Sequence, residues 1–169
     1  MHIRDATEDL IQDTYRRIEF DELRFAEVRQ GYAYWLGLCG ARLYPAREEI
    51  SPRPIRHLLA HVILLKVIAG GKDFEYTIVG DDVVRAYKAP LAQRRLSDIA
   101  TDLPNSARYW SCVYRDIVET GQPWAVRYSA QLEREACFAD AEAVLLPLGS
   151  SPGCVDHLIT FAKRVRCSP

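Results

Sequence analysis

Histidine and cysteine are common metal ligands, and this sequence spaces them poorly for that use. His57 and His61 stand four residues apart, the spacing that lets two histidines on one helix share a zinc ion. The glutamate of the H-E-x-x-H pattern is missing, and the chain is expected to leave the helix for a strand at His61. The five cysteines contain no C-x-x-C pair. We therefore predict no metal site.

No side chains are spaced as a nucleophile with its general base. Ser150 and Ser151 lie in a turn beside proline, and Cys154 and His157 would point to opposite faces of a strand. Acidic pairs such as Glu48 with Glu49 fall in polar segments, where solvated carboxylates make poor general acids. The sequence thus predicts no catalytic residues and a protein that is not an enzyme.

Arginines are candidates for binding an anion. Arg42 and Arg47 belong to a group of four arginines within fifteen positions, and Arg94 lies in a later segment. Guanidinium groups hold phosphate or carboxylate through paired hydrogen bonds. We therefore name Arg42, Arg47 and Arg94 as candidate anion-binding residues. The alternative is that they brace loops against neighbouring acids such as Glu49.

Aromatic residues are the better candidates for a ligand pocket. They fall on the strands, small helices and long helix that are expected to converge, and they could line a mostly apolar cavity with hydroxyl groups that orient a ligand. The candidates are Tyr76, Tyr87, Trp110, Tyr114 and Tyr128. The alternative is a filled core without a cavity.

The elements that position these rings follow from apolar periodicity and turn residues. An apolar run at 61–68 is expected to be a buried strand, 70–73 a hairpin turn, and 74–79 the partner strand. Residues 80–103 form an irregular, proline-broken region of small helices. A short helix is also expected to begin at Ser51-Pro52.

The clearest helix opens at Asn105 or Ser106 and ends at Gly121. Its apolar residues recur at helical spacing: Trp110, Val113, Tyr114, Ile117 and Val118. Three strands are expected after it, at 124–128, 143–148 and 154–162. The sum is an α+β domain with a five-stranded antiparallel sheet and a long helix on one face.

Two further helices are expected at the N-terminus. The first is capped by Thr7 and includes Tyr15 and Ile18, and the second runs from Asp21 to about Cys39. We therefore divide the chain into an N-terminal helical extension, residues 1–40, and a main domain, residues 41–169. Because the apolar face of the second helix exceeds what one domain needs, we expect these helices to form a homodimer contact.

Composition restricts the environment and the partners. A net charge of −1 argues against general nucleic-acid binding. No apolar run approaches the roughly 18 residues of a membrane span, and no apolar segment follows the charged N-terminus as in a secretory signal. Dispersed, odd-numbered cysteines are typical of free thiols in a reducing compartment. We expect a cytoplasmic protein.

Several motifs between Trp35 and Ile99 resemble those of long stand-alone PAS domains of bacteria. In that family the motifs read L-P-A-R, D-P-x-x-I-x-x-L-L-P-H, V-L-L-D-V, F-x-Y-x-x-x-G and R-x-L-S-x-I. The corresponding segments here are 43–47, 51–61, 63–67, 74–80 and 95–99. The resemblance implies a PAS-like sensor fold at 41–169 that serves signal reception or protein assembly, with a small-molecule ligand and a regulatory protein as partners.

The same resemblance argues against two known cofactors. The flavin-binding PAS domains carry an N-C-R-F motif in the small-helix region, and residues 87–99 contain no cysteine. Haem-binding members use a histidine there, and residues 86–105 contain none. Two alternatives remain: a ligand-free adaptor or dimerisation protein, and a small enzyme on a cone-shaped α+β fold. The cone fold places its long helices before an uninterrupted sheet, whereas here the helix around Trp110 divides the strands.

Overall fold

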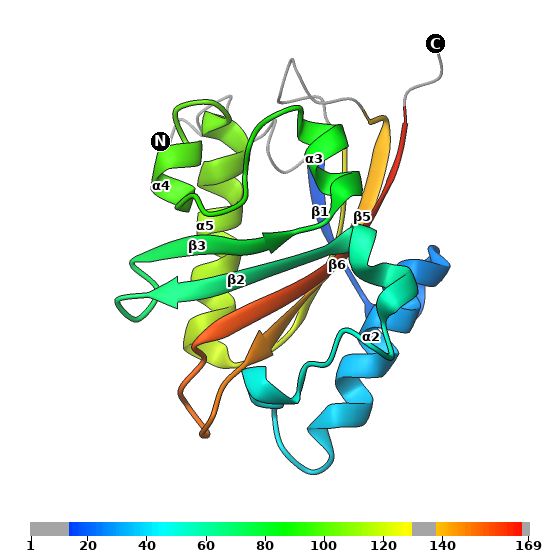
Figure 1. Cartoon of the computed structure of the whole chain (residues 1–169), viewed down its shortest axis with the longest axis vertical. Helices are drawn as coiled ribbons and strands as arrows, with labels where there is room; N and C mark the ends of the chain where they lie inside the picture. Colours follow the sequence, from blue (N-terminus) through cyan, green and yellow to red (C-terminus); the bar gives the residue numbers. More distant parts are fainter. Residues whose placement is uncertain (1–13, 130–137, 167–169) are drawn as a thin grey trace, which may run out of the picture.

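One antiparallel sheet organises the chain in the computed structural model, which describes residues 14–129 and 138–166 (Figure 1). Its strands, in chain order, are β1 Tyr15–Ile18, β2 Val62–Ile68, β3 Asp73–Val79, β4 Trp124–Tyr128, β5 Asp140–Leu148 and β6 His157–Val165. In space the order is β1-β4-β5-β6-β2-β3, and every neighbouring pair is antiparallel. The hairpin β2–β3 therefore joins the later strands through β6.

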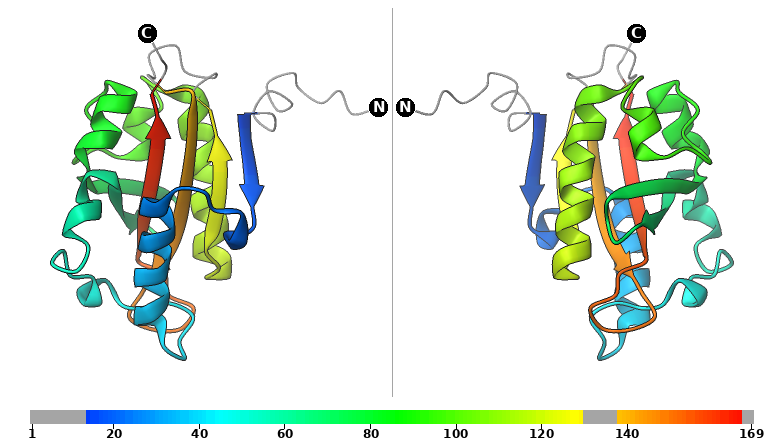
Figure 2. Two further views of the ribbon diagram at one scale, coloured as in Figure 1. Left: turned by 90° about the vertical axis from the view of Figure 1, so that its right-hand side faces the viewer. Right: turned by 90° about the vertical axis from the view of Figure 1, so that its left-hand side faces the viewer.

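Helices cover both faces of this sheet. They are α2 Ala26–Cys39, α3 Asp81–Tyr87, α4 Leu96–Ile99 and α5 Pro104–Thr120, with short 3-10 helices at Phe20–Glu22, Arg47–Glu49 and Arg56–His61. The two views of Figure 2 show α2 in front of one face and α5 in front of the other. The helix expected at Ser51-Pro52 is instead the 3-10 helix that begins five residues later, at Arg56.

The long helix α5 forms as its pattern predicts. Pro104 occupies its first turn, where a missing N–H costs no hydrogen bond, and Gly121 ends it in a left-handed conformation with φ 66°. The predicted apolar stripe is buried against the sheet, with Trp110, Tyr114 and Ile117 each under one tenth exposed. The predicted α+β fold, an antiparallel sheet with a long helix on one face, is confirmed. The sheet has six strands, not five.

The sixth strand comes from residues expected to be helical. Tyr15–Ile18 pairs with β4, placing Tyr15 opposite Tyr128 and Ile18 opposite Ala125. The two buried residues of β1 are three positions apart and so face opposite sides of the sheet. This spacing imitates a helical repeat, which is why the helix prediction was wrong for Tyr15 and Ile18. Residues 1–13, including the expected cap Thr7, lie outside the described residues.

The second expected helix is α2, and it begins at Ala26 rather than near Asp21. Its N-cap residue, Phe25, makes no side-chain capping hydrogen bond. Instead, the backbone N–H groups of Arg24 and Phe25 donate to Oε1 of Glu142 on β5, at 2.9 and 3.1 Å. Residues 23–25, which link the 3-10 helix at Phe20–Glu22 to α2, are thus held by a distant carboxylate, a contact that local sequence does not reveal.

The inner face of α2 packs closely on β5 and β6. Val28 and Trp35 are buried, and the Trp35 indole Nε1 donates to the carbonyl of Pro147 at 2.9 Å. A Cβ atom on Gly31 would lie only 2.1 Å from the ring of Phe161, so glycine is needed at this approach. The buried residues of α2 join the same apolar core as the sheet. The division at residue 40 stays a prediction.

No helix in the described part of the chain is long and apolar enough to cross a membrane.

Candidate functional site

All five predicted aromatic residues line a single space, the inner cavity, between the sheet and the helices α3, α4 and α5. Its volume is about 30 Å³. The other lining residues are Ile63, Val83, Leu91, Leu96, Ile99, Leu103, Ser106, Ala107, Ala143, Leu145, Thr160 and Arg164. Since one water needs about 10–15 Å³ of such volume, the inner cavity holds about two waters or a very small organic group as it stands.

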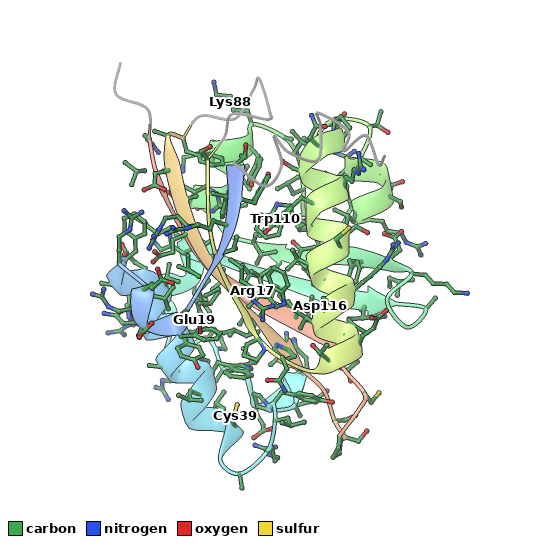
Figure 3. All side chains as sticks on the ribbon, turned by 180° about the vertical axis from the view of Figure 1, so that it is seen from behind. Arg17, Glu19, Cys39, Lys88, Trp110 and Asp116 are labelled. Atoms are coloured by element: carbon green, nitrogen blue, oxygen red, sulfur yellow. The ribbon has the colours of Figure 1, made fainter. Side chains whose placement is uncertain are left out.

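The five aromatic residues reach the inner cavity from four elements. Tyr76 is on β3, Tyr87 ends α3, and Tyr128 ends β4. Trp110 and Tyr114 lie on successive turns of α5, which directs both rings toward the sheet. Figure 3 shows Trp110 between α5 and the strands.

The rings pack on one another around the inner cavity. Trp110 lies between Tyr114, with ring centroids 6.0 Å apart and stacked, and Tyr128, with centroids 5.2 Å apart and the rings edge to face. The hydroxyl groups of Tyr76 and Tyr114 are 3.3 Å apart. Tyr15 of β1 stacks on the outer side of Tyr128 at 5.4 Å, so the sixth strand supports this wall.

Burial keeps the tyrosine hydroxyls protonated. It raises the pKa of Tyr76, and it raises the pKa values of Tyr114 and Tyr128 well above their ordinary range, because a phenolate would lose its hydration inside the protein. The cavity therefore offers neutral hydroxyl groups that can donate or accept hydrogen bonds on apolar walls. That chemistry suits binding and orientation of a small organic molecule.

Three polar residues of the inner cavity were missed by sequence reasoning: Ser106, Thr160 and Arg164. Thr160 and Arg164 lie on β6 and are 4% and 7% exposed. The last strand was expected at 154–162, but it runs from His157 to Val165. Arg164 therefore fell outside the predicted strand. The available signal was strand parity, because Arg164 shares a face with Thr160, four residues earlier.

The three predicted anion-binding arginines do not come together at this cavity. Arg42 donates to both oxygens of Glu49, at 2.7 and 2.8 Å, and Arg94 donates to Asp102 at 2.8 Å. Arg42 follows α2 and Arg94 precedes α4, which Figure 1 shows at opposite ends of the molecule. Arg47 lies in the 3-10 turn beside Glu49. For Arg42 and Arg94 these contacts match the loop-bracing alternative.

His57 and His61 contact different neighbours. His57 Nε2 lies 2.9 Å from Oε1 of Gln30, whereas His61 Nδ1 lies 3.4 Å from Oδ2 of Asp82. Across residues 14–129 and 138–166, no group of three or more His, Cys, Asp or Glu side chains is placed to hold a metal ion.

Comparison with known proteins shows which family the chain resembles. A family model described as a PAS domain matches residues 24–161. A solved structure similar to the chain is the N-terminal domain of a diguanylate cyclase with PAS/PAC sensor from Marinobacter aquaeolei. It is 22% identical, the match covers 61% of this chain and 94% of that one, and the TM-score is 0.43. No curated protein matches the chain.

Proposed function

Because the chain belongs to the PAS domain family, we propose that it is a non-catalytic sensor or scaffold domain of a signalling system. In this proposal it binds a small molecule in the inner cavity and acts through association with another protein in the cytoplasm. The observation that carries the proposal is the convergence of five aromatic side chains, from β3, α3, α5 and β4, on one interior space. A core that needed only filling would not place polar Thr160 and Arg164 on the same walls.

Strand β6 offers a physical connection from the inner cavity to the opposite face of the sheet. Thr160 and Arg164 line the inner cavity, while the intervening Phe161 packs on Gly31 of α2. A ligand that shifts β6 would therefore change the packing of α2. Such a change passes on a signal only if the ligand binds the two arrangements with different affinity.

Native mass spectrometry of freshly purified protein tests ligand binding. We expect a retained small molecule, visible as an added mass on the chain. Ala107 lines the cavity from α5, so Ala107→Leu should fill the space and abolish the added mass. Ala33 is exposed on α2, so Ala33→Leu is the matched control and should keep it.

The small volume of the inner cavity favours one alternative, a ligand-free adaptor. Under that alternative the purified chain carries no added mass, and Ala107→Leu changes only its stability. A panel of small organic molecules that leaves the thermal midpoint of the wild-type chain unchanged would support the same alternative. These results would contradict the sensor proposal while leaving the adaptor in place.

We also propose that α2 and the loop after it contribute the homodimer contact expected from sequence. The inner face of α2 is occupied by the sheet, but Leu36 and Leu43 are 52% and 58% exposed. Apolar side chains with this degree of exposure are suited to burial against a second copy of the chain. Light scattering coupled to size exclusion should give a dimer for the wild type and a monomer for Leu36→Glu. A monomeric wild type contradicts this contact.

A further inference from the structure

Arg164 is a buried cation whose hydrogen bonds are incomplete. Its side chain is 7% exposed. Nη2 donates to the hydroxyl of Tyr128 at 3.0 Å, while Nε and Nη1 have no acceptor. No carboxylate in the described residues forms a direct ion pair with it, although the charge of Asp82 acts on it and raises its pKa. A buried guanidinium group without a directly paired carboxylate is costly, since its desolvation is only partly offset.

The surroundings of Arg164 fit an anionic group better than water alone. Burial disfavours its charged form, but Tyr128, Tyr87 and the charge of Asp82 more than offset this and raise the pKa of Arg164, so the cation persists. The ring centroids of Tyr87 and Phe138 lie 5.2 and 5.8 Å from its Cζ atom. Thr160 Oγ1, on the same strand face, also lacks a partner. Water would satisfy these donors but would not place a negative charge in contact with the guanidinium group.

Arg164 also borders a second space that opens to the surface. This outer hollow has a volume of about 200 Å³ and is lined by Asp82, Arg85, Ala86, Arg164 and Arg166. Arg85 and Arg166 are exposed. Three cations against one carboxylate give the hollow a positive potential, which raises the local concentration of anions. Arg164 thus lies between a positively charged entrance and the inner cavity.

We propose that Arg164 anchors a short organic monocarboxylate, with the carboxylate on its guanidinium and Thr160 and the apolar part against Trp110 and Tyr87. The inference rests on the proposed function, because it takes the inner cavity to be a ligand site. A carboxylate supplies both the missing acceptors and a negative charge in direct contact with the guanidinium group. The volume of about 30 Å³ restricts the acid to a few carbon atoms unless the walls move apart.

Isothermal titration of the full chain with sodium propionate and with propionamide, at constant ionic strength, tests this inference. The two probes match in shape and differ in charge. We expect propionate to bind at least tenfold more tightly than propionamide, and Arg164→Met to remove that preference. Arg85→Met, at the rim of the outer hollow, should keep the preference even if binding becomes slower.

The variant is expected to fold, since replacing an unpaired buried charge by an apolar side chain is often neutral or stabilising. Circular dichroism before titration verifies this. Thr160→Val provides an independent variant that keeps the cation and removes one hydroxyl. It should weaken propionate binding at least threefold and leave propionamide binding less affected.

The outcomes separate this inference from the proposed function. Equal binding of the two probes, or propionate binding that Arg164→Met leaves unchanged, overturns the carboxylate anchor while ligand binding stands. A molecule that is retained in native mass spectrometry and identified as neutral likewise overturns the carboxylate anchor while ligand binding stands. A retained carboxylic acid supports the anchor. If neither probe binds and no molecule is retained, both the anchor and the sensor proposal fail.

Discussion

Glu142 provides the sharpest stability test of this fold. It is fully buried on β5, where Oε1 accepts the backbone N–H groups of Arg24 and Phe25 and Oε2 accepts Nη2 of Arg127 at 3.1 Å. One carboxylate therefore fixes the entry of α2 and also neutralises a largely buried arginine. The substitution Glu142→Gln keeps the shape of the side chain and removes its charge.

The expected loss can be worked from these three hydrogen bonds. A hydrogen bond to a charged group contributes about 1.5–3 kcal/mol, and a neutral acceptor roughly half of that. The two backbone bonds would each lose about 1 kcal/mol, and the bond from Arg127 would be lost because an amide N–H would face it. The free energy of unfolding should fall by about 3–5 kcal/mol, the range found when a buried pair is broken.

Urea unfolding followed by tryptophan fluorescence measures this loss. With a slope of about 3 kcal/mol per M, the midpoint should fall by about 1–1.7 M. Asp140→Asn is the matched control, because Asp140 lies on the same strand and pairs with Arg24 at 2.7 Å, but its side chain is 41% exposed. An exposed pair contributes at most about 1 kcal/mol, or about 0.3 M. Midpoints lowered equally by both variants would refute the role given to Glu142.

Two further predictions use contacts elsewhere in the chain. Gly31→Ala should lower the free energy of unfolding by about 1–3 kcal/mol, because the new Cβ would lie 2.1 Å from the ring of Phe161. Gly37→Ala is the control: its new Cβ would have nothing within 4 Å, so the free energy of unfolding should rise by about 0.5–1 kcal/mol. Equal effects of the two substitutions on the urea midpoint would refute the close approach. Hydrogen bonds from Arg42 and then from the Ala46 N–H lower the pKa of Glu49 to about 2, so their stabilising effect is complete above about pH 4.5 and is lost as the pH falls through 2. The carboxyl ¹³C shift of Glu49 should titrate near that value and move toward 4.5 in Arg42→Gln, and an unchanged midpoint would contradict the pairing.

Local patterns predicted most of the fold because its main elements carry strong signals of their own. The stripe around Trp110 and the stop at Gly121 define α5, and the turn at Gly70-Gly71 defines the β2–β3 hairpin. The predictions failed where contacts between distant segments of the chain determine the local structure. Tyr15–Ile18 is a strand because it pairs with β4. Helix α2 begins at Ala26 because Glu142, more than a hundred residues later, holds the segment before it.

The candidate site was likewise predictable from local sequence only in part. Aromatic rings on converging elements could be chosen from sequence, since large rings in strands and amphipathic helices point toward a common core. Their convergence on one cavity follows from the sheet order. Arg164 was not predicted, because a charged residue near the end of a strand is expected to be solvent-exposed unless its neighbours are known. The packing of Tyr87, Tyr128 and Phe138 around it shows that it faces inward.

The unpaired charge of Arg164 gives the proposed sensor a reason to change state. Without an anion, the core around β6 carries a cation that no carboxylate of the described residues pairs with directly, which is costly in the interior. A bound carboxylate removes this cost, and at a hundred times its dissociation constant it adds about 2.7 kcal/mol to the free energy of unfolding. The strand stabilised in this way also presents Phe161 to α2 on the opposite face. Occupancy of the inner cavity would then set how firmly α2 is held, which ties the ligand site to the surface proposed for association.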